Sequence, residues 1–262
     1  MRFHLKEELK KLSSIIKKMD RKVIIVFLSV AILQTISWYF TSRLFFRYNL
    51  FNYFSSSQNV DIYEFIYWFI GDFFSLFLLP LLVILLVLKG KPKSFGLQLG
   101  DYKAGLKIAF YFIMIMLFIT WIASASSSFV ETYPLLKRTK TSWGLFFIFE
   151  TGMLLYLFAW EFIWRGFMLF GLEEKFGFYA VLIQMIPFVI LHNGKPPVET
   201  FSAILGGIAL GILAFRTRSF LYCVIVHMSV MFTIDLFSTL RYRVADYGIG
   251  ISSLIHIIKE IF

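Results

Sequence analysis

The chain has a single cysteine, few charged residues and no long polar segment. Cys223 lies inside an apolar run, so neither a disulfide framework nor a cysteine-based metal site is available. Charged residues make up 16% of the 262 residues, compared with about 25% in a typical soluble domain. No internal repeat and no low-complexity tract interrupts the sequence. These absences exclude a disulfide-rich scaffold and argue against a soluble enzyme.

Hydrophobic residues fill the sequence instead. They account for 59% of it, and aromatic residues alone account for 20%. Apolar runs of about 20 residues recur, and each is long enough for a helix to cross a hydrocarbon core of about 30 Å. Because backbone polar groups in lipid must be satisfied within each segment, we expect an all-α fold. The prediction is a polytopic membrane helix bundle of about eight transmembrane helices around a polar intramembrane cavity, with spans near 22–42, 62–88, 104–126, 144–171, 178–193, 200–215, 219–239 and 247–262. The fifth and sixth of these runs are short for full spans.

The N-terminal residues differ from the rest. Residues 1–21 are polar and basic, and we expect a cytoplasmic segment here without a cleavable signal peptide. Residues 22–262 then form the integral membrane domain. Apolar residues at helical spacing predict an amphipathic helix on the inner leaflet, although a solvated tail that only sets topology is an equally good interpretation. These apolar residues are Leu5, Leu9, Leu12, Ile15 and Ile16.

The net charge of +10 raises the question of nucleic acid. The distribution of the charge argues against it, because basic residues are about twice as frequent in segments on the N-terminal side of the membrane as on the other side. The charge therefore indicates topology and attraction to anionic lipid. We expect an integral protein of a bacterial plasma membrane with its N-terminus in the cytoplasm, the lipid bilayer as its partner and no nucleic acid.

Two opposite charges lie in the apolar run 144–171. Glu161 and Arg165 are one helical turn apart within Trp160-Glu-Phe-Ile-Trp-Arg-Gly166, so they share a helix face and are able to pair. Charged residues inside a membrane are costly and usually functional. The pair is therefore the first candidate for a site, although a purely structural ion pair has the same spacing.

Two histidines lie in the later spans. His192 ends an apolar segment before a Gly-Lys-Pro-Pro turn, and His227 lies within 219–239. At about 1.5 Å per residue, Glu161, His227 and His192 lie about 15, 12 and 21 Å from the inner surface, so they are able to converge. Two histidines and a carboxylate suit either a zinc ion held by His192 and His227 or general-base activation of water. Spacing alone does not separate these two chemistries.

Other features of the spans have several interpretations. The small residues Gly207 and Gly211 predict close helix packing. Four further acidic residues lie in or beside the spans, and the sequence does not assign them a role: Asp72, Glu150, Glu199 and Asp235.

The order and spacing of these residues resemble the CPBP family. This family comprises CAAX-processing type II prenyl endopeptidases, related bacterial intramembrane proteases and bacteriocin-immunity (Abi) proteins. Its pattern is Glu-Glu-x-x-x-Arg, then Phe-x-x-x-His, then His-x-x-x-Asn. Here the matching residues are Glu161 with Arg165, Phe188 with His192, and His227, so the similarity covers a core at 144–239. The resemblance implies an eight-helix bundle with a cavity open to the cytoplasmic leaflet.

The chain departs from this pattern at two positions. Trp160 stands where the family has its first glutamate, and Met231 stands where the family has its asparagine. In the family that glutamate and the two histidines form the catalytic group, and the asparagine helps to stabilise an oxyanion. The departures therefore put catalytic competence in question.

Three functions follow as hypotheses. The first is an intramembrane endopeptidase of CPBP/CAAX type that hydrolyses a peptide bond in a peptide or protein tail. Its water would be activated by Glu161, His192 and His227, with Arg165 holding Glu161 ionised. The second is a catalytically impaired scaffold or immunity-type protein of the same fold. The third is a small transporter, which would use Asp72, Glu161 and Asp235.

Overall fold

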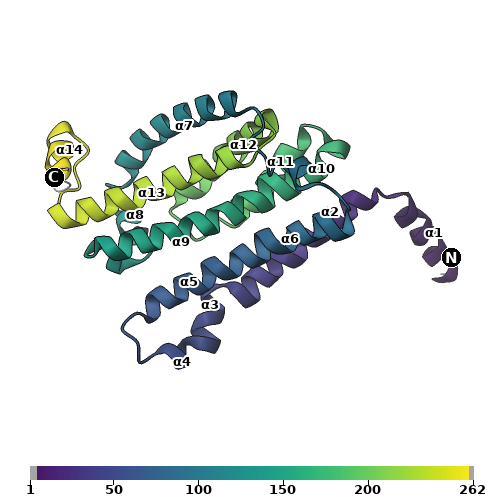
Figure 1. Ribbon diagram of the computed structural model, residues 1–262, viewed down its shortest axis with the longest axis horizontal. Helices are drawn as coiled ribbons and strands as arrows, with labels where there is room; N and C mark the ends of the chain where they lie inside the picture. The colour runs from purple at the N-terminus through teal and green to yellow at the C-terminus, as the bar shows by residue number, and fades with distance from the viewer. Residues whose placement is uncertain (1–4, 260–262) are drawn as a thin grey trace.

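The computed structural model describes residues 5–259, and every regular element among them is a helix. The all-α prediction is therefore confirmed (Figure 1). Several long helices contain short stretches of π-helix, which are named η together with two short 3-10 helices. The elements are α1 Leu5–Lys18, α2 Arg21–Ile36, η1 Ser37–Thr41, α3 Arg43–Phe45, η2 Phe46–Leu50, α4 Phe51–Phe54, α5 Val60–Phe73, η3 Phe74–Leu78, α6 Leu79–Leu82, η4 Val83–Val87, η5 Pro92–Phe95, α7 Tyr102–Ala123, α8 Ser127–Thr132, η6 Lys137–Lys140, α9 Trp143–Glu161, η7 Phe162–Met168, α10 Leu169–Phe176, α11 Tyr179–Ile190, α12 Pro197–Thr217, α13 Leu221–Val244 and α14 Ile251–Ile258.

Within the described part, six helical stretches are long and apolar enough to cross a membrane by length and composition. The predicted span 178–193 forms only the short apolar helix α11. The predicted span 247–262 forms α14, a helix of eight residues, and residues 260–262 lie outside the described residues. Ile257 of α14 packs against Trp121 and Leu240, so this helix covers the end of the bundle. The six stretches are Arg21–Phe54, Val60–Val87, Tyr102–Ala123, Trp143–Phe176, Pro197–Thr217 and Leu221–Val244.

Loops from distant parts of the sequence meet at the two ends of the bundle. At the end that we call the basic end, segment 89–101 lies against the α12–α13 turn, where the Asp101 amide donates to the Thr217 carbonyl at 2.9 Å. At the opposite end, the loop end, Arg241 joins segment 124–142 to the α13–α14 turn. Its Nε donates to the Ser124 hydroxyl at 2.8 Å and its Nη1 donates to the Gly248 carbonyl at 2.7 Å. Figure 1 shows α1 beyond the basic end and α14 at the loop end.

Helices α9 and α13 form the centre of the bundle. In the most apolar window of each span, 56% of the residues are buried in the α9–α10 span and 50% in α13, against 17–33% in the other four. The two helices pack against each other, and α13 also packs on α7 (Figure 1). Polar side chains on α9 and α13 are consequently shielded from lipid by the surrounding helices.

The N-terminal helix α1 is amphipathic, as predicted. Its apolar residues are all largely exposed, with exposed fractions of 53–60%, because no other helix covers them. These residues are Leu5, Leu9, Leu12, Ile15 and Ile16. Contact of this face with the membrane surface stays a prediction.

The predicted close packing at Gly207 and Gly211 is confirmed. A Cβ atom added at Gly211 would lie 2.7 Å from Gln184 Nε2 and 2.9 Å from Val181 Cγ1. Gln184 of α11 also donates to the Gly207 carbonyl at 2.9 Å. Helices α11 and α12 therefore approach closely, and this contact holds the turn that carries His192.

We expect Gly211→Val to destabilise the protein by about 1–3 kcal/mol, because the added atoms overpack a closed contact. Gly206→Val is the matched control, since a Cβ atom there meets nothing within 4 Å. The measurement is unfolding of the purified protein in detergent. Equal stability of the two variants would contradict the assigned contact.

Candidate active site

The candidate site is built around the carboxylate of Glu161, the last residue of α9. Its Oε1 atom accepts a hydrogen bond from Arg165 Nη1 at 3.1 Å and another from His227 Nδ1 at 2.6 Å. Arg165 belongs to η7 and His227 to α13, so one oxygen joins two neighbouring helical segments. The predicted ion pair is present, and the predicted convergence of Glu161 with His227 is also found.

The ion pair is fully enclosed and the histidine is only partly covered. The side chains of Glu161 and Arg165 have no exposed surface, while that of His227 is 14% exposed. The Arg165 guanidinium also lies 4.0 Å from the centre of the Phe188 ring, a cation–π contact that adds to its stabilisation. The exposed edge of the group is therefore the imidazole and not the carboxylate.

His192 joins the same group through Phe188. The two rings lie 4.4 Å apart, and the Phe188 ring lies 6.2 Å from that of His227. Nδ1 of His192 donates to the Phe188 carbonyl at 2.7 Å. Phe188 is therefore the spacer between the two histidines, and the structure brings all four predicted site residues into one cluster.

The hydrogen bonds assign the same tautomer to both histidines. A carboxylate and a backbone carbonyl only accept, so Nδ1 must carry the proton in His227 and in His192. In the neutral ring Nε2 then presents a lone pair, and neither Nε2 has a hydrogen-bond partner among residues 5–259. Each ring is thus able to accept a proton from a water molecule or a substrate.

The π-helix η7 shapes this part of the chain. Such wide turns within an α-helix are often found at functional sites, and this one begins directly after Glu161. Several buried polar atoms here have no hydrogen-bond partner in the described structure, namely Glu161 Oε2, Trp164 Nε1, Arg165 Nε and Arg165 Nη2. Buried polar groups without partners are uncommon and need an explanation. Their grouping around one ion pair marks a polar centre in an otherwise apolar bundle.

Trp160 packs over this centre. Its ring lies 5.6 Å from that of Trp164, 6.2 Å from Phe188 and 6.4 Å from His192. Met231, one turn after His227, is also buried. The two positions at which the chain departs from the family pattern are therefore both occupied by apolar side chains close to the histidines.

The residues of the site do not fit a zinc centre. Zinc in proteins takes three or four ligands from histidine, cysteine or carboxylate side chains. No group of three such side chains able to hold a metal ion exists in the described chain. Glu161 Oε1 is also already bound by Arg165 and His227, so we derive no step through a metal ion.

Four other acidic residues lie apart from this cluster. Asp72 accepts hydrogen bonds from Ser37, Thr41 and Trp68, which satisfies it structurally. Glu199 accepts from the Tyr133 hydroxyl at 2.7 Å. The remaining two, Glu150 and Asp235, face each other nearer the loop end. Tyr133 lies in a loop, and no sequence pattern pointed to it.

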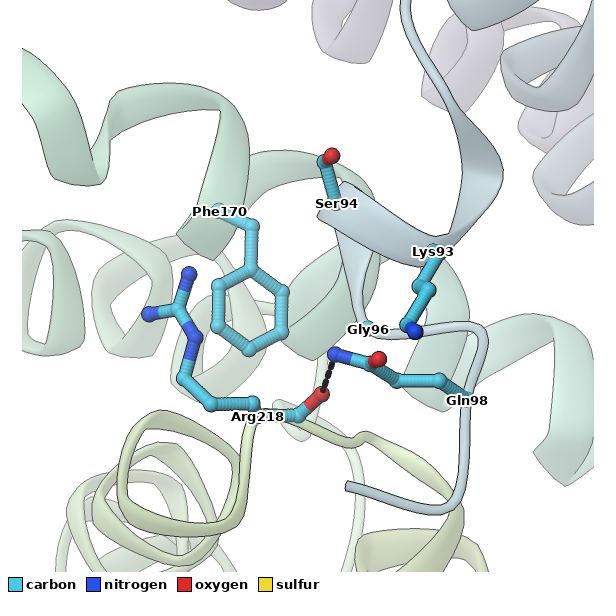
Figure 2. A pocket seen from close by; sticks show the side chains of 6 residues that line it. All are labelled: Lys93, Ser94, Gly96, Gln98, Phe170 and Arg218. Carbon is cyan, nitrogen blue, oxygen red and sulfur yellow. Dashed lines mark hydrogen bonds between the residues drawn. The ribbon is translucent and has the colours of Figure 1, made fainter.

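Two cavities lie away from the candidate site. One, of about 270 Å³, is at the basic end between η5, Phe170 and Arg218, and Figure 2 shows Gln98 donating to the Arg218 carbonyl beside it. The other, of about 760 Å³, is apolar and lies between α5, η3 and α9. Neither of these two cavities is lined by Glu161, His192 or His227.

Comparison with known protein families agrees with this geometry. The sequence model of the family described as type II CAAX prenyl endopeptidase Rce1-like matches residues 141–233. The match confirms the resemblance to the CPBP family. The matched segment contains Glu161, Arg165, His192 and His227, and it supports a protease-type enzyme embedded in a membrane. No curated protein and no solved structure matches the chain.

The ion pair leads to a stability prediction. Arg165→Met leaves a buried carboxylate with one partner fewer, and we expect it to cost about 3–5 kcal/mol. The double variant Glu161→Leu/Arg165→Met removes both charges and should be less destabilised than Arg165→Met alone. Unfolding of each variant in detergent measures the coupling. Additive losses would contradict the pairing.

Proposed function

We propose that this chain is an intramembrane endopeptidase in which Glu161 orients His227 and His227 activates water. The observation that carries the proposal is the 2.6 Å bond from His227 Nδ1 to Glu161 Oε1. A carboxylate bound to one imidazole nitrogen fixes the tautomer and leaves the other nitrogen as a base. Glu161 itself is fully buried, so the partly exposed imidazole is the better acceptor for a proton from water.

The reaction that fits this arrangement is hydrolysis of a peptide bond. The water oxygen attacks the peptide carbonyl carbon while one of its protons passes to His227 Nε2. The Glu161 carboxylate then stabilises the imidazolium, and Arg165 holds that carboxylate charged and oriented. The imidazolium returns the proton to the leaving nitrogen as the C–N bond breaks, which yields a carboxylate and an amine.

His192 has a second positioning role in this proposal. With its Nδ1 proton donated to the Phe188 carbonyl, its Nε2 atom only accepts. A water molecule has two O–H groups, so one can donate to His227 and the other to His192. The water lone pair then points away from both rings and towards a substrate carbonyl. The substrate in this reading is a peptide or protein tail that enters from the membrane or its inner surface, with the N-terminus of the enzyme in the cytoplasm.

We expect His227→Ala to lower kcat by about 10²–10⁴-fold, because a general base contributes a factor of this size. His256→Ala is the matched control. This exposed histidine lies on α14 at the loop end, where it pairs with Asp246. The assay is cleavage of a farnesylated CAAX peptide by purified protein in proteoliposomes. Full activity of His227→Ala would rule out the proposed base.

The second candidate function is a scaffold or immunity-type protein that keeps the fold without the chemistry. It is favoured by the packing of Trp160 among Trp164, Phe188 and His192, where the family pattern has a carboxylate. The two candidates predict different outcomes when that carboxylate is supplied.

If the chain is a peptidase with a weakened site, Trp160→Glu should raise cleavage by tenfold or more, since a second carboxylate next to His192 supplies a further base. Trp160→Gln is the matched control, because glutamine has the shape of glutamate without its charge. The measurement is kcat on the same farnesylated peptide. If Trp160→Glu is no more active than Trp160→Gln, and wild type and His227→Ala are equally inactive, the scaffold function is favoured.

A further inference from the structure

A second polar cluster lies between α9 and α13, nearer the loop end than the candidate active site. Glu150 of α9 and Asp235 of α13 are 4% and 1% exposed. Their carboxyl groups lie within hydrogen-bonding reach of each other. The two residues are far apart in the sequence, and the packing of α9 on α13 brings them together.

As long as both are ionised, these two carboxyl groups have no side-chain donor to bind, and the Leu135 backbone is the one donor directed at Asp235 in the described residues. All four of their oxygens are buried and without a hydrogen-bond partner in the described part of the chain. The Ser238 and Thr239 hydroxyls, one turn after Asp235, are buried and unpartnered as well. Two carboxylates in contact inside a protein do not both ionise, because repulsion and lost hydration favour a state with one bound proton.

The charged groups around the pair are already engaged. On the turn before α12, Lys195 donates to the Tyr133 hydroxyl at 3.1 Å, and Tyr133 donates to Glu199 of α12 at 2.7 Å. In the segment 133–140, Lys137 donates to the Glu131 carbonyl at 2.7 Å. No cation therefore binds either carboxyl group directly among residues 5–259, and a proton is what remains to neutralise the contact.

We propose that Glu150 and Asp235 form a proton-binding site that holds one shared proton and keeps the segment 133–140 closed over it. With the proton bound, one carboxyl group donates to the other and the pair carries a single negative charge, close to Lys195 and Lys137. When the pH on the loop side rises and the proton leaves, two like charges face each other beneath the segment, whose Leu135 backbone reaches Asp235 and whose η6 turn packs on both α9 and α13. The segment 133–140 then opens to water, which hydrates the charges.

Infrared difference spectroscopy of the full-length protein in proteoliposomes tests for the proton. At neutral pH we expect a carbonyl-stretch band of a protonated carboxyl group that is lost in both Glu150→Gln and Asp235→Asn. An amide donates a hydrogen bond to the remaining carboxylate, so both variants should fold. Glu131→Gln, which changes an exposed acid on the preceding helix α8, should retain the band. If the spectra of Glu150→Gln and Asp235→Asn both match wild type in this region, the proposal is overturned.

Hydrogen exchange of the segment 133–140 tests the coupling. At each pH, the amide exchange rate of the segment in wild type is divided by the rate in Glu150→Gln. We expect this ratio to increase by tenfold or more over the pH range in which the carboxyl band disappears. Comparison with Glu150→Gln at each pH removes the intrinsic pH dependence of exchange. A constant ratio across that range would overturn the link between the proton and the loop.

Discussion

The arrangement of the central helices depends on one carboxylate that binds two partners. Glu161 Oε1 accepts from Arg165 on its own helical stretch and from His227 on α13. A charge at this depth is costly unless it is paired and hydrogen-bonded. The same bond that neutralises Glu161 also fixes the rotation of α13 against α9 and sets the tautomer of His227. One atom, Glu161 Oε1, therefore both joins α9 to α13 and orients the imidazole of His227.

Trp160 changes what this carboxylate is able to do. The family pattern that the chain resembles has two adjacent glutamates. The first activates water, which leaves the second able to pair with the arginine. Here the neighbouring position carries an indole ring packed against Phe188 and His192. Both partners of Glu161 bind its Oε1 atom, and in the proposed mechanism the imidazole of His227 is the base. In the proposed mechanism, the Glu161–His227 pair takes the place of the family's first glutamate as the base that activates water.

The sequence predicted contacts within one helix more reliably than contacts between helices. The spacing of Glu161 and Arg165 was sufficient to pair them, and counting residues from the membrane surface placed His227 at a similar depth. The pairing of Glu150 with Asp235 depends on how α9 packs on α13. The spacing of residues along one helix does not show which other helix it packs against. The run 178–193 is short for a full span, and in the structure it forms the short helix α11. Tyr133 was missed because its partner, Glu199, lies 66 residues away.

The two polar contacts between α9 and α13 follow from a single geometric relation. Glu150 and Glu161 are 11 residues apart, about three helical turns, so they lie on the same face of α9. The helices run antiparallel, and their partners Asp235 and His227 accordingly appear in the reverse order on α13. The two contacts differ in what neutralises them. Arg165 gives Glu161 a permanent charge partner, whereas Glu150 meets only another carboxyl group. The first contact therefore contains its own cation, and the second depends on a proton that exchanges with the solution.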